Sequence, residues 1–411
     1  MIPAIAPVAA LLIGVAILLT GQGLQGTLLP VRATLENFPT LAVGVIGATY
    51  FLGFTIGCWQ GTGLVKRVGH VRVFAAMTAL ASASPLLHGM WINLWSWSLL
   101  RFISGFCFAV LYVVIESWLN ESATNENRGS VFSAYVLINM TMLAVGQQML
   151  MMDDPAVMTL FARSSVLVSL AAVPVALSTA PTPRQVEDVK LDVPYLYRNS
   201  PAGMLGSLAT GLANGSFRSL APVFTLSYST DIALTAWFLS AAVIGGAASQ
   251  WPLGAWSDRV DRRFVMGVCA AVAVLLSITI WMFADSMTPT IVIVLGGLWG
   301  AAAFPLYSIS IAHSNDHAAS DEFVVVSSGL LLMYGVGAVA GPILAAAFMQ
   351  ILGAAGLYVF TGLIHAVLLV YLFVRRLRRN PAPPEEQHTF TEALTASHTR
   401  SQVYEQEVSN G

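Results

Sequence analysis

Four residues that could bind or move a charged group lie in one apolar stretch of the sequence. Gly105, Tyr112 and Glu116 follow Arg101 at spacings of 4, 11 and 15 residues, so at about 100° per residue they share one face of a helix. An arginine inside an apolar helix costs at least about 2.5 kcal/mol unless it meets water or a partner. Burial also favours the protonated form of a carboxylate. The pattern predicts a polar stripe with a functional arginine and a carboxylate that could carry a proton.

Each of the two charged residues has a structural alternative. Arg101 lies only a turn or two inside its apolar run, so its side chain could instead extend to the membrane surface. Glu116 could instead support a gate by pairing with Lys66 or Arg67. The two charges cannot pair with each other, because 15 residues place them about 22 Å apart along a helix. Both alternatives stay open at the level of the sequence.

A short basic motif occurs twice, each time between long apolar runs. Gly61 to Arg72 reads GTGLVKRVGHVR, and Gly254 to Arg263 reads GAWSDRVDRR. An offset of 192 residues aligns Lys66 with Asp258, so the first copy has a cation where the second has an anion. Asp258 is expected to accept hydrogen bonds from neighbouring arginines and from the beginning of a helix over residues 323–350. The residues of this gate motif are Lys66, Arg67, Gly69, Gly254, Asp258, Arg259, Arg262 and Arg263.

The elements that must position these residues follow from the composition. The 411 residues are 56% hydrophobic and 10% charged, whereas a soluble domain carries about 25% charged residues. Apolar runs of about 20 residues, enough to cross a hydrocarbon layer of about 30 Å, recur along the chain. Lipid offers no partner to an exposed amide, so these runs must be helical. We therefore expect an all-α membrane protein.

Twelve membrane-spanning helices are expected, in two halves of six. The segment after the sixth apolar run is charged and contains prolines, which is typical of a linker. The chain after residue 376 is too polar to form a core, and we expect it to be disordered. The expected units are a six-helix bundle over 1–180, a cytoplasmic linker over 181–200, a second six-helix bundle over 201–376 and a tail over 377–411. The expected helices cover residues 5–30, 41–63, 72–92, 95–118, 129–151, 156–180, 202–223, 233–255, 264–284, 288–312, 323–350 and 353–376.

The two halves are expected to be copies in the same orientation, related by pseudo-symmetry. Small, aromatic and turn residues recur at an offset of 192 residues early in each half and of 195 residues later. The second offset aligns Arg101 with Gly296, so only one half carries that charge. The recurring identities include Gly23 with Gly215, Pro30 with Pro222, Gly53 with Gly245, Gly105 with Gly300, Tyr112 with Tyr307 and Gly146 with Gly341.

Basic residues predict the orientation. If the N-terminus is cytoplasmic, 15 of the 19 lysines and arginines fall in inner loops and the tail. The positive-inside rule then places both termini in the cytoplasm, and we expect a bacterial inner-membrane protein.

Several classes of function are disfavoured by composition. The net charge of −2 and the lack of basic blocks outside the loops and tail give no sign of nucleic-acid binding. Cys58, Cys107 and Cys269 lie in apolar runs without metal-ligand spacing, and isolated cysteines of this kind are usually small buried hydrophobes. No cluster of His, Asp or Glu converges within the spans, so we expect neither a metal site, nor a cofactor, nor an enzyme.

The motifs resemble those of the major facilitator superfamily, whose pattern after the second and eighth helices is G-x-x-x-D-R-x-G-R-R. The second basic copy matches this pattern except for Asp261 at a glycine position, and the first departs from it at Lys66. The runs VIESWLNES and GVIGATYFLGFTIG look most like the YcaD-type bacterial members. Further matches are Arg101 with Gly105, the E-x6-R-G set Glu121, Arg128 and Gly129, and the G-x-x-x-G-P set Gly337, Gly341 and Pro342.

The resemblance implies a central cavity lined by the first, fourth, seventh and tenth helices. Any of the polar residues in the spans could instead make a helix-to-helix hydrogen bond, worth about 0.6 kcal/mol on average. The candidate substrate residues are Gln22, Gln25, Tyr50, Arg101, Tyr112, Asn139, Asn214, Arg218 and Tyr307.

The expected function is secondary active transport of a small solute by alternating access. No nucleotide-binding loop is present in the sequence, so we expect a gradient of protons to supply the energy, with Glu116 and Arg101 as coupling residues. The expected partners are a small-molecule substrate, protons and the lipid bilayer, and we expect a monomer. An uncoupled facilitator and a non-transporting membrane receptor or scaffold remain the alternatives.

Overall fold

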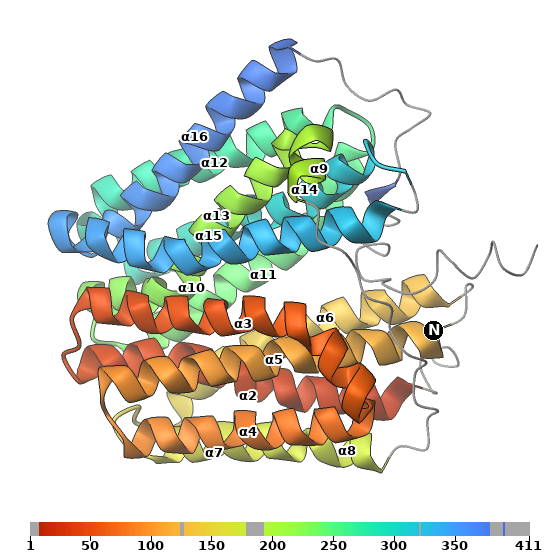
Figure 1. The fold of residues 1–411 in the computed structure, drawn as a ribbon. Coiled ribbons are helices and arrows are strands. Elements are labelled where there is room, and N and C mark those ends of the chain that lie inside the picture. The colour runs from red at the N-terminus through yellow and green to blue at the C-terminus, as the bar shows by residue number, and fades with distance from the viewer. Residues whose placement is uncertain (1–7, 124–126, 178–192, 320–321, 379–388, 391–411) are drawn as a thin grey trace, which may run out of the picture.

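The protein is a bundle of long helices in two groups that lie one above the other (Figure 1). The computed structural model describes residues 8–123, 127–177, 193–319, 322–378 and 389–390. No strand occurs among these residues. The expected all-α fold is therefore confirmed.

The first group contains the helices of the N-terminal half. The short helix η2 (Met149–Met152) continues α6, and the sixth span is interrupted between α7 and α8. The helices are α2 (Ala9–Leu35), α3 (Thr40–Val68), α4 (His70–Met90), α5 (Leu94–Ser122), α6 (Arg128–Gln148), α7 (Thr159–Leu170) and α8 (Ala172–Ala176).

The second group repeats this arrangement. The short α9 (Val193–Asn199) precedes it, at the end of the expected linker, and η3 (Ala284–Ser286) follows α12. The fourth span of this half is divided into two helices at Phe304, the residue before Pro305. The helices are α10 (Pro201–Tyr228), α11 (Ile232–Ser257), α12 (Arg262–Phe283), α13 (Pro289–Ala303), α14 (Pro305–Asn315), α15 (Phe323–Leu352) and α16 (Gly356–Arg378).

Helices occupy all twelve expected positions, and eleven of those in the described part of the chain are long and apolar enough to cross a membrane. The twelfth is α10, which is rich in glycine, serine and alanine. Most of its residues are buried by other helices. Because α10 faces protein on most sides, small residues that allow close packing replace the large apolar ones that lipid would favour.

Several helix ends differ from the sequence-based boundaries. α2 passes through Pro30 and ends at Leu35, beyond the expected end. α3 includes Lys66 and Arg67 in its last turn, where cations interact favourably with the helix dipole. The loop expected there is reduced to Gly69, whose φ of +92° suits glycine.

The internal repeat is visible in the contacts of matching glycines. In each half, four glycines lie so close to a neighbouring helix that a methyl group would overlap its backbone. The residues that these glycines contact are separated between the two halves by 192 or 195 positions in the sequence, which are the same two offsets that separate the glycines. The matching pairs are Gly53–Phe102 with Gly245–Gly297, Gly105–Tyr50 with Gly300–Ala242, Gly23–Leu143 with Gly215–Ala338, and Gly146–Thr20 with Gly341–Leu212.

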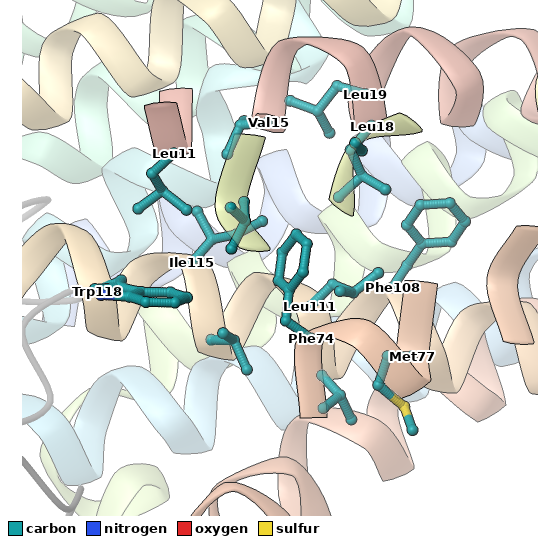
Figure 2. Close-up of a cluster of buried hydrophobic side chains, with 14 of the residues drawn as sticks. Leu11, Val15, Leu18, Leu19, Phe74, Met77, Phe108, Leu111, Ile115 and Trp118 are labelled. Carbon is teal, nitrogen blue, oxygen red and sulfur yellow. The ribbon is translucent and has the colours of Figure 1, made fainter. Parts of the chain in front are cut away.

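Large apolar side chains fill the interior of each half. In the N-terminal half α2, α4 and α5 contribute Leu11, Phe74, Phe108 and Trp118, which lie in one buried cluster (Figure 2). This cluster keeps α5, and the polar stripe on it, in a fixed position against its neighbours.

The two halves are in contact at one end of the bundle. We call the end that carries Arg67, Arg259 and Arg376 the basic end. At the opposite end Gln148 donates from Nε2 to Ser240 Oγ at 2.7 Å. A methyl group on Gly44 would lie 2.6 Å from the carbonyl oxygen of Pro342. The contacts between the halves therefore extend from the opposite end towards the middle.

Candidate functional site

The interior polar cluster forms where α5 packs directly on α3. Gly53 and Gly105 leave no room for a side chain, since a methyl group on either would overlap a backbone carbonyl of the other helix. The two backbones therefore touch at this level. This contact brings Arg101, one turn before Gly105, against the side chain of Tyr50.

Tyr50 is the residue on which three helices converge. Gln22 on α2 donates from Nε2 to the Tyr50 hydroxyl at 2.9 Å. The Tyr112 hydroxyl on α5 donates to Gln22 Oε1 at 2.8 Å. The guanidinium carbon of Arg101 lies 4.1 Å from the centroid of the Tyr50 ring, which is a cation–π contact. Four of the candidate substrate residues thus form one connected cluster.

Arg101 lies against this cluster. Its side chain is half-buried, and its guanidinium stacks on Tyr50 rather than extending towards the membrane surface. Among the residues that the structure describes, no carboxylate lies within ion-pair distance of it. Stacking uses the face of the guanidinium and leaves its N–H edges available.

The second half contributes an arginine to the same region. Arg218 on α10 is exposed, and it is close enough to Tyr50 and Tyr112 to act on both electrostatically. A methyl group on Gly47, one turn before Tyr50, would overlap Ser219. The helix that carries Arg218 therefore packs directly on the helix that carries Tyr50.

Two candidate amides are buried with unused hydrogen-bonding groups. Gln25 is 1% exposed and Asn214 is 6% exposed. Gln25 Nε2 and Asn214 Oδ1 have no hydrogen-bond partner within the described chain. Buried polar groups are rarely left unpaired in folded proteins, so each is available to a further partner. Another candidate is Tyr307, whose ring centroid lies 5.0 Å from that of Tyr334.

Glu116 lies further along α5, towards the basic end. It accepts a hydrogen bond from the Tyr135 hydroxyl at 3.4 Å, and Asn139 hydrogen-bonds to the same tyrosine. Among the described residues Glu116 forms no ion pair with Lys66 or Arg67. In this conformation Glu116 therefore does not make the ion pair that the gate alternative expects.

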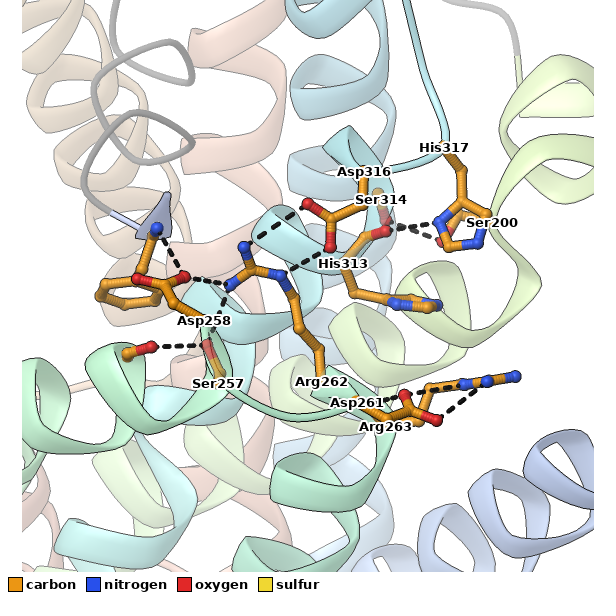
Figure 3. A network of polar contacts seen from close by, with 12 residues as sticks. Ser200, Ser257, Asp258, Asp261, Arg262, Arg263, His313, Ser314, Asp316 and His317 are labelled. Atoms are coloured by element: carbon orange, nitrogen blue, oxygen red, sulfur yellow. Dashed lines mark hydrogen bonds and ion pairs between the residues drawn. The ribbon is translucent and has the colours of Figure 1, made fainter. Parts of the chain in front are cut away.

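The second copy of the gate motif forms a buried ion-pair cluster (Figure 3). Arg262 donates from Nε to Asp316 Oδ2 at 2.6 Å and pairs through Nη1 with Asp258 Oδ1 at 3.0 Å. Arg262 and Asp316 are 2% and 5% exposed. Next to them, Arg263 forms a two-point contact with Asp261 at 2.9 and 3.0 Å. Gly254 lies one turn before this cluster, and Arg259 is exposed beside it.

The expected partner of Asp258 at the beginning of α15 is replaced by a residue of the C-terminal tail. The Phe390 backbone N–H donates to Asp258 Oδ1 at 2.8 Å. The Phe390 ring is 4% exposed and covers Gly254, where a methyl group would overlap it. Thus Asp258 binds an arginine, as expected, but its second donor comes from the tail. Residues 379–388 and 391–411 lie outside the described chain.

The first copy of the gate motif has different chemistry. His70 occupies the position that the offset of 192 aligns with Arg262, and its Nε2 lies 3.1 Å from Ser117 Oγ. Lys66 is half-buried and Arg67 is exposed. The ion pair between Arg262 and Asp316 therefore has no equivalent at His70.

Sequence reasoning missed Asp316, Tyr135 and Phe390. Asp316 aligns with Glu121 at the offset of 195, so the repeat contained a signal for it. Tyr135 lies seven residues after Arg128 in an ordinary apolar pattern, and only the packing of α6 near α5 brings it to Glu116. The isolated Phe390 in a polar tail gave no helical or strand pattern from which its burial could be inferred.

Comparisons with known proteins agree on the family and the fold. The profile of the Major Facilitator Superfamily matches residues 203–405. The uncharacterized MFS-type transporter YcaD of Escherichia fergusonii is 29% identical over 347 residues, which cover 84% of this chain and 89% of that protein. The uncharacterized MFS-type transporter Ent638_1421 of Enterobacter sp. is 28% identical and covers 92% of this chain and 97% of that protein.

Solved transporter structures share the fold at low sequence identity. The nucleoside transporter NupG superposes with a TM-score of 0.77 at 13% identity, covering 89% of this chain and 98% of that one. A bacterial homolog of the human lysosomal transporter Spinster, in an inward-facing and occupied conformation, gives 0.74 at 13% identity, covering 93% and 97%.

Proposed function

We propose that this chain, which is similar to members of the major facilitator superfamily, is a membrane transporter that moves a small solute by proton-coupled alternating access. The observation that carries the proposal is the polar cluster around Tyr50. Gln22, Tyr112 and Arg101 reach it from one half, and Arg218 faces it from the other. A solute that binds between the halves stabilises the relative position of the two halves that is complementary to the solute.

The contacts between the halves support the alternating-access part. They lie at the end opposite the basic end, for example between Gln148 and Ser240. In the proposed cycle these contacts separate while the gate motifs approach each other. We place the basic end and both termini in the cytoplasm, following the positive-inside rule, with the protein acting as a monomer in a bacterial inner membrane.

Glu116 is the proposed proton carrier. It is half-buried, lies on the same helix as Arg101, and has a hydroxyl rather than a cation as its partner. A carboxylate without a counter-ion in such surroundings can be neutralised by a proton.

The proposal is tested in proteoliposomes loaded with a pH-sensitive dye and exposed to a solute library. We expect at least one solute to change the lumenal pH only when the protein is present. Glu116→Gln should abolish this pH change but keep exchange of labelled solute, because the binding cluster is intact. The matched control Asp285→Asn alters an exposed acidic residue on η3, outside the polar cluster, and should retain both activities.

Two results would contradict parts of this proposal. A Glu116→Gln protein with an undiminished pH change would exclude Glu116 as the carrier. Solute exchange by the wild type without any pH change would instead identify an uncoupled facilitator.

A further inference from the structure

We infer that the solute is an organic anion held between Arg101 of the N-terminal half and Arg218 of the C-terminal half. The inference rests on the proposed transport function and specifies the substrate class of that site. It follows from how the arginines of this chain are paired with acids.

Five arginines of the described chain contact a carboxylate, and most of the others are exposed. Arg32 contacts Glu36 at 2.6 Å, and Arg163 contacts Asp153 at 3.4 Å. The same holds for arginines at the basic end, namely Arg262, Arg263 and Arg376. Within the described chain, Arg101 and Arg218 are the two arginines beside the polar cluster, and neither has an acid within 4.0 Å.

The surroundings of Arg101 do not neutralise it. The centroid of the Tyr50 ring lies 4.1 Å from its guanidinium carbon. A tyrosine ring stabilises a cation by only about 0.5–2 kcal/mol. A guanidinium carries five N–H donors arranged to bind a carboxylate or phosphate through two parallel hydrogen bonds. These donors point to a ligand with two acceptor oxygens.

Arg218 provides the second positive charge from the opposite half. Its neighbours on α10, Phe217 and Ser219, are 2% and 6% exposed, whereas Arg218 itself is exposed. It acts electrostatically on Tyr50 and Tyr112, which belong to the other half. The exposed side of α10 at this level therefore faces the polar cluster.

No acid at this level balances the two cations. The acidic residue of α5 nearest to Arg101 is Glu116, about 22 Å away along the helix axis at 1.5 Å per residue. A neutral solute would leave both guanidiniums without a counter-ion when the halves close around it, which is costly once water is excluded. An anion bound by both arginines would also draw the two halves together, so that binding favours closure around the solute.

Matched pairs of probes that differ in charge test this inference. The purified protein is titrated with succinate and succinamide, with benzoate and benzamide, and with inorganic phosphate, and the melting temperature is followed. We expect at least one of the anions to raise the melting temperature saturably and the two amides to have no effect. Arg101→Gln and Arg218→Gln should each weaken the response by about tenfold or more, equivalent to about 1.4 kcal/mol.

Two further variants control for folding and charge. Arg163→Gln removes an arginine that is paired with Asp153, away from the cluster, and should respond to anions as the wild type does. Arg101→Lys keeps the charge but loses the two-point geometry, so it should retain part of the response. Arg218→Gln changes an exposed side chain and is expected to fold normally.

The inference is overturned if the amides stabilise as well as the anions, if none of the anions has an effect, or if both glutamine variants respond like the wild type. Anion binding that needs both arginines, without solute movement in proteoliposomes, supports the anion site. That result would contradict the transport function instead.

Discussion

At the scale of single residues, Tyr50 combines two separable contacts. Its hydroxyl accepts a hydrogen bond from Gln22 at 2.9 Å, and its ring supports Arg101 at 4.1 Å. The same side chain thus fixes both the amide and the cation of the proposed site. Substitutions that remove one contact at a time can separate the two effects.

Tyr50→Phe should reduce solute affinity moderately, because it removes the hydroxyl but keeps the ring under Arg101. A neutral hydrogen bond contributes about 0.5–1.5 kcal/mol, which corresponds to a loss of about two- to tenfold in affinity. Tyr50→Leu also removes the cation–π contact and should lose a further amount of about 0.5–2 kcal/mol. Titration of each purified variant with the best-binding anion measures both effects.

Tyr197→Phe is the control, since Tyr197 is 58% exposed and lies on α9 outside the cluster. It should bind like the wild type. Equal affinities for the Tyr50→Leu variant and the wild type would show that Arg101 does not depend on this ring.

At the scale of elements, the close approach of α3 and α5 depends on glycine. A side chain at Gly105 would overlap the Tyr50 carbonyl, while Gly63 on α3 has no atom within 4 Å of the position its methyl group would take. Gly105 therefore has no room for a methyl group, whereas Gly63 has room for one. The equivalent contact in the other half is made by Gly300.

Gly105→Ala and Gly300→Ala should each lower the thermal stability of the purified protein, because overpacking costs about 1–3 kcal/mol. Gly63→Ala should be neutral or stabilising by up to about 1 kcal/mol, since alanine favours a helix more than glycine does. Thermal unfolding in detergent compares the three variants. A Gly105→Ala protein as stable as the Gly63→Ala protein would contradict the tight packing of α3 on α5.

Periodicity and composition were sufficient for the number, order and approximate limits of the helices. They failed at Pro30, where α2 continues through a proline, and at Lys66, where α3 continues past the end of its apolar run. In a bundle, neighbouring helices can satisfy the groups that a proline leaves free. The site was harder to predict, because the approach of Tyr135 to Glu116 depends on packing between helices and leaves no local pattern.

At the scale of the whole molecule, the repeat joins two similar halves with unequal chemistry. Matching glycines give both halves the same internal packing. Arg101 aligns with Gly296, and the space near Gly296 is filled by the Phe238 ring. The basic end is also unequal, because Arg262 pairs with Asp316 whereas His70 meets Ser117.

Relative movement of the halves can be measured with two pairs of spin labels. Asn37 and Thr230 are exposed at the end opposite the basic end, and Arg72 and Arg259 are exposed at the basic end. Because the halves now meet at the opposite end, a saturating solute should lengthen the distance between labels at Asn37 and Thr230 and shorten that between Arg72 and Arg259. Double electron–electron resonance measures both. Unchanged distances, or changes of the same sign in both pairs, would argue against alternating access.

The composition of α10 has a consequence for how the protein is made. A segment is released from the translocon into lipid according to its own apolarity, and α10 is the span whose composition falls short. It precedes α11, which is strongly apolar, and it is covered by other helices in the finished bundle. We therefore expect α10 to wait at the translocon until α11 emerges and to enter the bilayer with it as a hairpin. The helix that carries Arg218 would then enter the bilayer only together with α11. Assembly of the second half would therefore begin with the insertion of these two helices.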